Sequence, residues 1–382
     1  MGLCQILVHG WRRVEPHNGI LECSCELEGF PQEFLGHLHM PGFSFVSGLF
    51  AAGIATIENG KVSIAFSKLK GSLRDLILLR VTMIPFLTLL PLTFGKGWIF
   101  AYKNITGTPL VLFPGVWYLE TLFVWHLVTP LICMAGQRAV IIAGVVALTC
   151  RPRLDVEYNG MFFYFFFYVL GVVLGGGGKS NKERAEARKY LEQWLVDVKV
   201  RVAACLLMSV WVATCNVSMP EPLMMIFNMN TDFARTVTPW NLGGLYTDAA
   251  RICFNVLLLA SFLAIMFMLP AWELVASTGS RTLYVYVLHI AMLVSNPALH
   301  WLPHYSRRAG GWYVVWTGII SVIFTLLLGS RLMKAILHYV VQPQWLVDLM
   351  IPEDKKDAPD SPLTPATAPD SHGHIKQGLL SA

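Results

Sequence analysis

The sequence predicts an all-α membrane protein, a polytopic transmembrane helix bundle of about nine complete spans. Three observations support this class. Hydrophobic residues make up 55% of the chain and charged residues only 14%, against roughly 25% charged residues in soluble domains. The mean hydropathy is +0.54. Apolar runs of about 17 to 25 residues, enough to cross a bilayer core as helices, recur along the chain. A single soluble core is therefore excluded.

The expected spans follow these apolar runs in order. They are residues 35–57, 76–95, 112–134, 136–150, 160–177, 202–220, 250–270, 282–298 and 311–330. The run at 136–150 is short and needs its flanking polar side chains to reach the two interfaces. Residues 1–9 resemble the last turns of a truncated first span, although a short apolar start of no consequence is the alternative. We therefore expect nine complete spans after a partial one.

Basic residues in the connections predict the orientation, because Lys and Arg are retained on the cytoplasmic side. If the first span runs outward, the cytoplasmic set holds more basic residues than the opposite set. It comprises the connections at 61–74, 138, 179–201, 281 and 331–334. This predicts a cytoplasmic C-terminus. Residues 1–345 form the expected transmembrane domain, and residues 346–382, rich in Pro, Ser, Ala and Asp, form an expected disordered tail.

Two further segments belong to the connections. The run Gly175-Gly176-Gly177-Gly178-Lys179 lacks the spacing of a phosphate-binding loop and does not follow a strand, so we interpret it as a flexible hinge between a span and a loop. Residues 181–199 alternate charged and apolar side chains, which predicts an amphipathic helix on the cytoplasmic membrane surface. A plain solvated helix is the alternative.

No metal site or disulfide framework is expected. The eight cysteines are mostly scattered through apolar runs, and Cys23-Ser24-Cys25 is not a Cys-x-x-Cys motif. His37 and His39 are two residues apart, which places them on different sides of a helix.

Ionisable and polar side chains within or near the spans are the candidate functional residues, because such groups are costly at membrane depth unless they line a polar interior. Near the predicted outer ends lie His9, His39, Trp117 and Glu120; deeper lie His126 and His289; near the inner ends lie Arg74, Arg80 and Arg281. Together they could form one polar column that links the two faces of the membrane.

This column suits acyl transfer to a hydroxyl. A histidine can accept the hydroxyl proton, and His9 and His39 are the candidate bases. The phosphates of a cytoplasmic thioester such as acetyl-CoA call for cations, which Arg74, Arg80 and Arg281 would supply. Simpler roles stay open: these arginines could anchor helix ends to lipid headgroups, and His126 is better interpreted as a hydrogen-bonding residue between helices.

Three sequence elements resemble one known family. The segment His39-Met40-Pro41-Gly42-Phe43-Ser44-Phe45-Val46-Ser47-Gly48 resembles the Phe-His-Met-Pro-Leu-Phe-Phe-Phe-Leu-Ser-Gly signature of the membrane-bound acyltransferase 3 family, in its branch similar to fucose 4-O-acetylases. Trp117-Tyr118-Leu119 is similar to its Trp-Phe-Leu element. Residues 277–289, which include Tyr284 and His289, resemble its Gly-x-x-Ser/Thr-Leu-Tyr-Ile-Tyr-Leu-x-His element. The three elements occur in order and span most of residues 1–335.

The resemblance implies an integral membrane O-acyltransferase, usually an O-acetyltransferase, that moves an acyl group from a cytoplasmic acyl-CoA to a hydroxyl of a carbohydrate or a related acceptor. It implies a catalytic histidine in the first span, matched by His9, about eleven positions after an Arg. The chain holds too few residues before His9 to include that Arg. We therefore expect either an upstream start or a weakened, non-catalytic member that acts as a scaffold.

A small-solute transporter is the third alternative, although no internal repeat or matched pair of broken helices is found in the sequence. The expected partners are the acyl donor, the acceptor and the lipid bilayer. Neither a bound cofactor nor a nucleic acid is expected. The sequence does not name the acceptor or the membrane.

Overall fold

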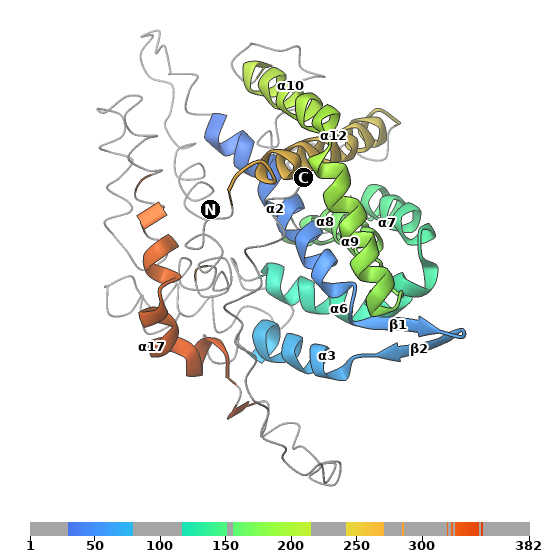
Figure 1. Cartoon of the computed structure of the whole chain (residues 1–382), viewed down its shortest axis with the longest axis vertical. Helices are drawn as coiled ribbons and strands as arrows, with labels where there is room; N and C mark the ends of the chain where they lie inside the picture. The colour runs from blue at the N-terminus through green and yellow to red at the C-terminus, as the bar shows by residue number, and fades with distance from the viewer. Residues whose placement is uncertain are drawn as a thin grey trace, which may run out of the picture.

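The computed structural model describes residues 30–78, 117–150, 156–214, 242–270 and 325–343, with a few single positions between 285 and 346. Figure 1 shows that this part is mostly helical, as predicted. Its helices are α2 (Phe30–Ala51), α3 (Phe66–Ser72), α6 (Trp117–Ala135), α7 (Arg138–Thr149), α8 (Val156–Leu174), α9 (Asn181–Val196), α10 (Val198–Thr214), α12 (Leu242–Met266) and α17 (Arg331–Val341). A π-helical turn, η2 (Leu73–Leu78), continues α3.

Five of the predicted spans coincide with helices of the structure. The predictions at 112–134, 136–150, 160–177, 202–220 and 250–270 correspond to α6, α7, α8, α10 and α12. Helix α7 has 12 residues and is short, as expected. Helix α12 has 25 residues and begins before its predicted start. The apolar runs therefore predicted these helices, with errors at their ends.

Within the described part of the chain, two helices are long and apolar enough to cross a membrane, judged by length and composition. They are Tyr118–Ala135 and Leu245–Met266, and shorter apolar helices cover Arg138–Thr149 and Met161–Leu174. The predicted spans 76–95, 282–298 and 311–330 lie largely outside the described residues, as do residues 1–9 and the tail. The number of spans therefore stays a prediction.

The predicted span 35–57 is wrong at its C-terminal end. Helix α2 ends at Ala51, and the chain then forms an antiparallel hairpin of strands β1 (Ala55–Glu58) and β2 (Lys61–Ile64). The loop is Asn59-Gly60, and both residues have positive φ angles, 51° and 75°. Such a two-residue loop matches the twist of paired strands, which is why Asn-Gly is a strong hairpin signal. Because the chain turns into this hairpin, α2 ends earlier than the hydropathy indicated.

Helices α2 and α8 pack backbone against backbone. A Cβ atom on Gly48 would overlap the carbonyl of Tyr168, and one on Gly171 would overlap the carbonyl of Phe45. Small residues at a helix crossing allow this close approach, which supplies van der Waals contact where the hydrophobic effect is weak. Tyr168 is fully buried and its hydroxyl bonds Thr129 of α6 at 2.6 Å. Helices α2, α6 and α8 therefore form the centre of the packed core.

The glycine run after α8 forms a turn between α8 and α9, which agrees with its predicted place between a span and a loop, while its predicted flexibility stays a prediction. Gly176 and Gly178 have φ angles of 75° and 80°, which glycine adopts without strain. The backbone N–H of Ile57 donates a hydrogen bond of 2.8 Å to the carbonyl of Gly178, and Thr56 forms a parallel bridge with the same glycine. The turn is thus joined to strand β1.

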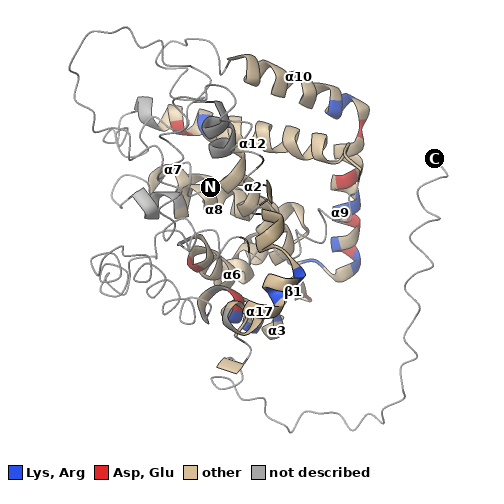
Figure 2. Ribbon diagram, turned by 90° about the vertical axis from the view of Figure 1, so that its left-hand side faces the viewer, with Lys and Arg blue, Asp and Glu red and all other residues tan. Residues whose placement is uncertain are grey.

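Helix α9 begins with a capping box, which explains where its helical region starts. The Ser180 hydroxyl accepts from the Glu183 N–H at 3.4 Å, and the Glu183 carboxylate accepts from the Ser180 N–H at 2.9 Å. The hydrogen bonds from Ser180 hold the pKa of Glu183 below its ordinary value. The predicted helix is confirmed, and Figure 2 shows charged residues of both signs along it. Its placement on a membrane surface stays a prediction.

Candidate functional site

His39 lies in the first half of α2, in partly apolar surroundings. Its side chain is half-buried, and its ring meets the ring of Phe43, one turn further on, edge-on at a centroid distance of 4.9 Å. Leu38 beside it is buried, and Pro41 lies inside the helix. Because proline has no N–H, the backbone carbonyl four residues before it loses its usual helical partner. The signature segment therefore combines an imidazole with a local break in helical hydrogen bonding.

Helix α6 meets α2 through its first turn. The Tyr118 hydroxyl and the Ser47 hydroxyl are 3.0 Å apart. Tyr118 and Glu120 are both buried, with 5% and 6% of their surface exposed. Trp117 begins the helix, but its side chain lies outside the described residues. Ser47 follows His39 by two helical turns, so Tyr118 contacts α2 about 12 Å further along the helix axis than His39.

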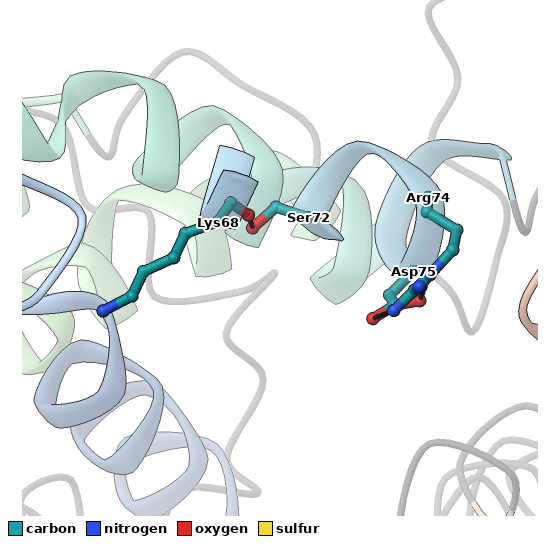
Figure 3. A network of polar contacts seen from close by, with 4 residues as sticks. All are labelled: Lys68, Ser72, Arg74 and Asp75. Carbon is teal, nitrogen blue, oxygen red and sulfur yellow. Dashed lines mark hydrogen bonds and ion pairs between the residues drawn. The ribbon is translucent and has the colours of Figure 1, made fainter. Parts of the chain in front are cut away.

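Arg74 lies in η2 and forms an ion pair with its neighbour in the chain. Its Nε is 2.5 Å from Oδ1 of Asp75, and its Nη2 donates to Oδ2 at 2.9 Å. Figure 3 shows the two side chains together at one end of the segment, with Lys68 extending from the other end. This two-point geometry is the strong form of an Arg–carboxylate pair. The donor-binding role of Arg74 stays a prediction.

His126 of α6 forms a hydrogen bond to α3, as its interpretation as an interhelical residue required. Its Nδ1 is 2.8 Å from the Ser72 hydroxyl oxygen. The same hydroxyl donates its one proton to the Lys68 carbonyl at 3.0 Å. When the Ser72 hydroxyl donates to this carbonyl, it accepts from His126 Nδ1, since a hydroxyl has one proton to donate. The bond fixes α3 against α6.

The structure places the two candidate residues His39 and Arg74 far apart along α2 and the segment that follows it. His39 lies about 18 Å along α2 from the end of that helix. Arg74 follows the hairpin and α3, beyond that same end. The other candidate residues lie outside the described part of the chain, so their predicted roles stay predictions: His9, Arg80, Arg281, Tyr284 and His289.

Two polar features were missed by the sequence analysis. Arg251 and Asp248 of α12 are buried, 2% and 8% exposed, with Arg251 Nη1 3.9 Å from Asp248 Oδ1. Their spacing of three residues on an apolar helix was the available signal. The second feature is a group of three cations at the end of α2: Lys68, Arg184 and Arg188. Lys68 lies in α3 and the two arginines lie in α9, so no local sequence pattern predicts that they meet.

Metal chemistry has no support in the described part of the chain, where no group of three or more His, Cys, Asp or Glu side chains could hold a metal ion. Its four described cysteines, Cys133, Cys150, Cys205 and Cys253, are free thiols.

The fold and the site define a class: an apolar, mostly helical protein that carries an imidazole and buried ionic groups on its helices. The family follows from comparison. The profile of the acyltransferase 3 family, described as an acyltransferase domain, matches residues 11–331. The chain belongs to this family, which is a polytopic membrane family, and it is an acyltransferase of the class that transfers groups other than aminoacyl groups. No curated protein and no solved structure matches the chain significantly.

Proposed function

We propose that this protein is an integral membrane O-acetyltransferase that moves the acetyl group of cytoplasmic acetyl-CoA, or a related acyl group, to a hydroxyl of a carbohydrate or similar acceptor. The observation that carries the proposal is the family match over residues 11–331 together with the half-buried imidazole of His39 in its signature segment. Family membership supplies the acyl transfer, while the donor, the acceptor and the fucose 4-O-acetylase-like branch are the proposal.

The reaction needs a base at the acceptor hydroxyl. The hydroxyl oxygen attacks the thioester carbonyl carbon while an imidazole nitrogen takes the hydroxyl proton, and a tetrahedral intermediate with an oxyanion forms. The C–S bond then breaks, the thiolate leaves, and the proton moves from the imidazolium to the sulfur. His39 is the proposed base on α2, with His9 of the preceding segment as its proposed partner.

The surroundings of His39 suit this role. Imidazole is the side chain best suited to take and return a proton in general acid–base chemistry. Its half-buried position leaves part of the ring accessible, and the edge-on contact with Phe43 restrains its orientation. Buried polar groups on α6, Tyr118 and Glu120, follow along the same helix pair. Trp117 and Glu120, with Tyr284 and His289, remain proposed substrate contacts.

The test uses purified full-length protein, acetyl-CoA labelled in the acetyl group and a panel of sugars. Wild type is expected to transfer label to at least one sugar. His39→Ala and His9→Ala are each expected to lower the rate by about 10² to 10⁴, as removal of a general base does. His338→Ala, in helix α17, is the matched control and is expected to transfer label as wild type does.

Three results would contradict the proposal in different ways. Label transfer that both histidine substitutions leave unchanged removes the assignment of the base but keeps the reaction. A wild type that transfers no label to any sugar removes the acceptor class. Counterflow of an unmodified solute across vesicles would instead indicate a transporter.

A further inference from the structure

Three cationic side chains meet where α2 ends. Lys68 reaches this point from α3, and its ammonium donates to the Gly53 carbonyl at 3.0 Å. Arg188 reaches it from α9, and its Nη2 donates to the Leu49 carbonyl at 3.3 Å. The Arg184 guanidinium carbon lies 3.7 Å from the position that a Cβ on Gly53 would occupy. Segments far apart in the sequence thus place three positive charges around one turn of backbone.

Arg184 is held in place by the glycine turn and the start of α9. Its Nη1 donates to the Lys179 carbonyl at 3.0 Å, and its Nη2 donates to the side-chain oxygen of Asn181. A Cβ on Gly176 would approach the Arg184 Cγ at 3.2 Å, closer than most Cβ contacts. Only 8% of Arg184 is exposed. The glycine turn therefore makes room for the guanidinium and orients it.

Within the described residues, the three cations form no hydrogen bond to a carboxylate. The hydrogen-bond acceptors of all three side chains are backbone carbonyls or an amide oxygen. Burial, and then repulsion from Arg184 and Arg188, holds the pKa of Lys68 below its ordinary value. A bound anion would relieve this repulsion.

Each of the three cations has a structural partner, because each donates to a backbone carbonyl or an amide oxygen. Positive side chains near a helix C-terminus interact favourably with the helix dipole, but this effect is small at an exposed position. One cation would supply that effect, whereas three like charges at one helix end repel one another. Lys68 and Arg188 are exposed, so an anion can reach them from solution.

We propose that Lys68, Arg184 and Arg188 form a binding site for the phosphate groups of the acyl-CoA donor. The inference rests on the proposed function, which requires such a donor. Coenzyme A carries a diphosphate and a 3′-phosphate, and Arg forks with a Lys point charge are the side chains that bind phosphates. Both connections that supply the cations are predicted to be cytoplasmic, and their contact at Gly53 places them at the same end of the helix bundle.

The phosphate of an anionic lipid headgroup shares this chemistry, so the experiment separates the two sources. Full-length protein is placed in nanodiscs of neutral lipid, and binding of coenzyme A and of 3′-dephospho-coenzyme A is measured by calorimetry, alongside the KM for acetyl-CoA. The test variant is the double substitution Lys68→Gln and Arg188→Gln. Its matched control is the double substitution Lys182→Gln and Lys189→Gln. This pair also removes two exposed charges, both from α9, the helix that carries Arg188.

Gly53→Ala provides a second variant that keeps every charge. A Cβ there would overlap the Lys68 ammonium, so the amine must leave its position. We expect the double variant to weaken binding of coenzyme A and to raise the KM about tenfold or more, as loss of charge-assisted hydrogen bonds does. Gly53→Ala should have a smaller effect in the same direction, and the control pair should change either value less than about twofold.

Each result decides the inference. Coenzyme A binding that the double variant and Gly53→Ala leave unchanged overturns the site, while label transfer in the same preparations keeps the proposed function. Equal losses in the test and control pairs reduce the effect to net charge and also overturn it. Weak coenzyme A binding in neutral lipid, with saturation of the site by anionic lipid, assigns the cations to a headgroup instead. Cluster-dependent binding without label transfer supports the site and contradicts the proposed function alone.

Discussion

Helix α2 carries two different chemical environments at its two ends. Near its start, His39 lies half-buried beside Phe43 and the buried Leu38. At its end, Lys68, Arg184 and Arg188 surround backbone carbonyls, and two of the three are exposed. One end offers a single titratable ring among apolar groups, and the other offers concentrated positive charge open to water.

This difference teaches how one helix can serve two steps of an acyl transfer. A proton transfer gains from a partly dehydrated site, where competing water is excluded. Recognition of a charged donor gains from a solvent-accessible cationic surface, which attracts anions before contact. The Ser47–Tyr118 hydrogen bond lies between the two ends and joins α2 to α6. The predictions below test whether the two ends act separately.

The largest expected effect is a separation of kcat from KM. His39→Gln should lower kcat by about 10² to 10⁴ and leave the KM for acetyl-CoA near its wild-type value, because a base acts in the chemical step. Steady-state kinetics with labelled acetyl-CoA measures both. A rise in KM with normal kcat would place His39 in substrate binding and end the distinction between the two ends of α2.

The next largest effect is a loss of stability where α2 packs against α8. Gly171→Ala introduces a methyl group against the Phe45 carbonyl, so α2 and α8 must move apart. We expect a loss of about 1 to 3 kcal/mol of stability, the usual range for overpacking. Thermal unfolding followed by size-exclusion chromatography reports it. The control is Gly71→Ala on α3, where a Cβ would meet nothing within 4 Å, and it should be at least as stable as wild type because Ala favours a helix over Gly.

The hydrogen bond in the middle of α2 should contribute less to stability than the contact between α2 and α8. Tyr118→Phe removes the hydroxyl that bonds Ser47 and should lower stability by about 0.5 to 1.5 kcal/mol. Ser47→Ala should have a smaller effect, because the Tyr118 hydroxyl also has Ser44 as a neighbour, and the double variant should be no worse than Tyr118→Phe alone. Additive losses in this cycle would mean that the two hydroxyls act on different partners.

The smallest effect is a pH dependence at the cationic end. Because the pKa of Lys68 is lowered, its amine loses its proton at a lower pH than an ordinary lysine, and affinity for coenzyme A should fall as the pH rises through that value. The expected loss is about threefold, as for one partly screened charge. Lys68→Arg, which stays protonated, should abolish the decline. Calorimetry between about pH 7 and about pH 10, where the phosphates are already ionised, tests this.

Much of the helical framework could be predicted because apolar run length reflects the bilayer. Helices α6, α7 and α8 lie within a few residues of their predicted ranges. The hairpin after α2 was missed because residues 52–57 are apolar enough to extend a span, and the Asn59-Gly60 signal was not weighed against hydropathy. Local turn chemistry overrode composition there.

The site could be predicted only in part. His39 is identifiable from its signature segment, because the neighbours that define it are adjacent in sequence. Arg74 was selected as a cation near a span end, yet the adjacent Asp75 already indicated an ion pair. The three-cation group could not be predicted, because it forms only when the glycine turn brings α9 back to the end of α2.

The contact of glycine backbones has a consequence for how substrates travel. Where Gly48 and Gly171 allow α2 and α8 to touch, no space is left between these helices for a water file or for a flexible chain. If the proposed cation site holds the donor, its thioester arm has to reach His39 along another flank of α2. The flank facing α6, where the Ser47 and Tyr118 hydroxyls meet, is one polar flank, and a bulky thiol-reactive probe attached at Ser47→Cys tests whether the arm passes there.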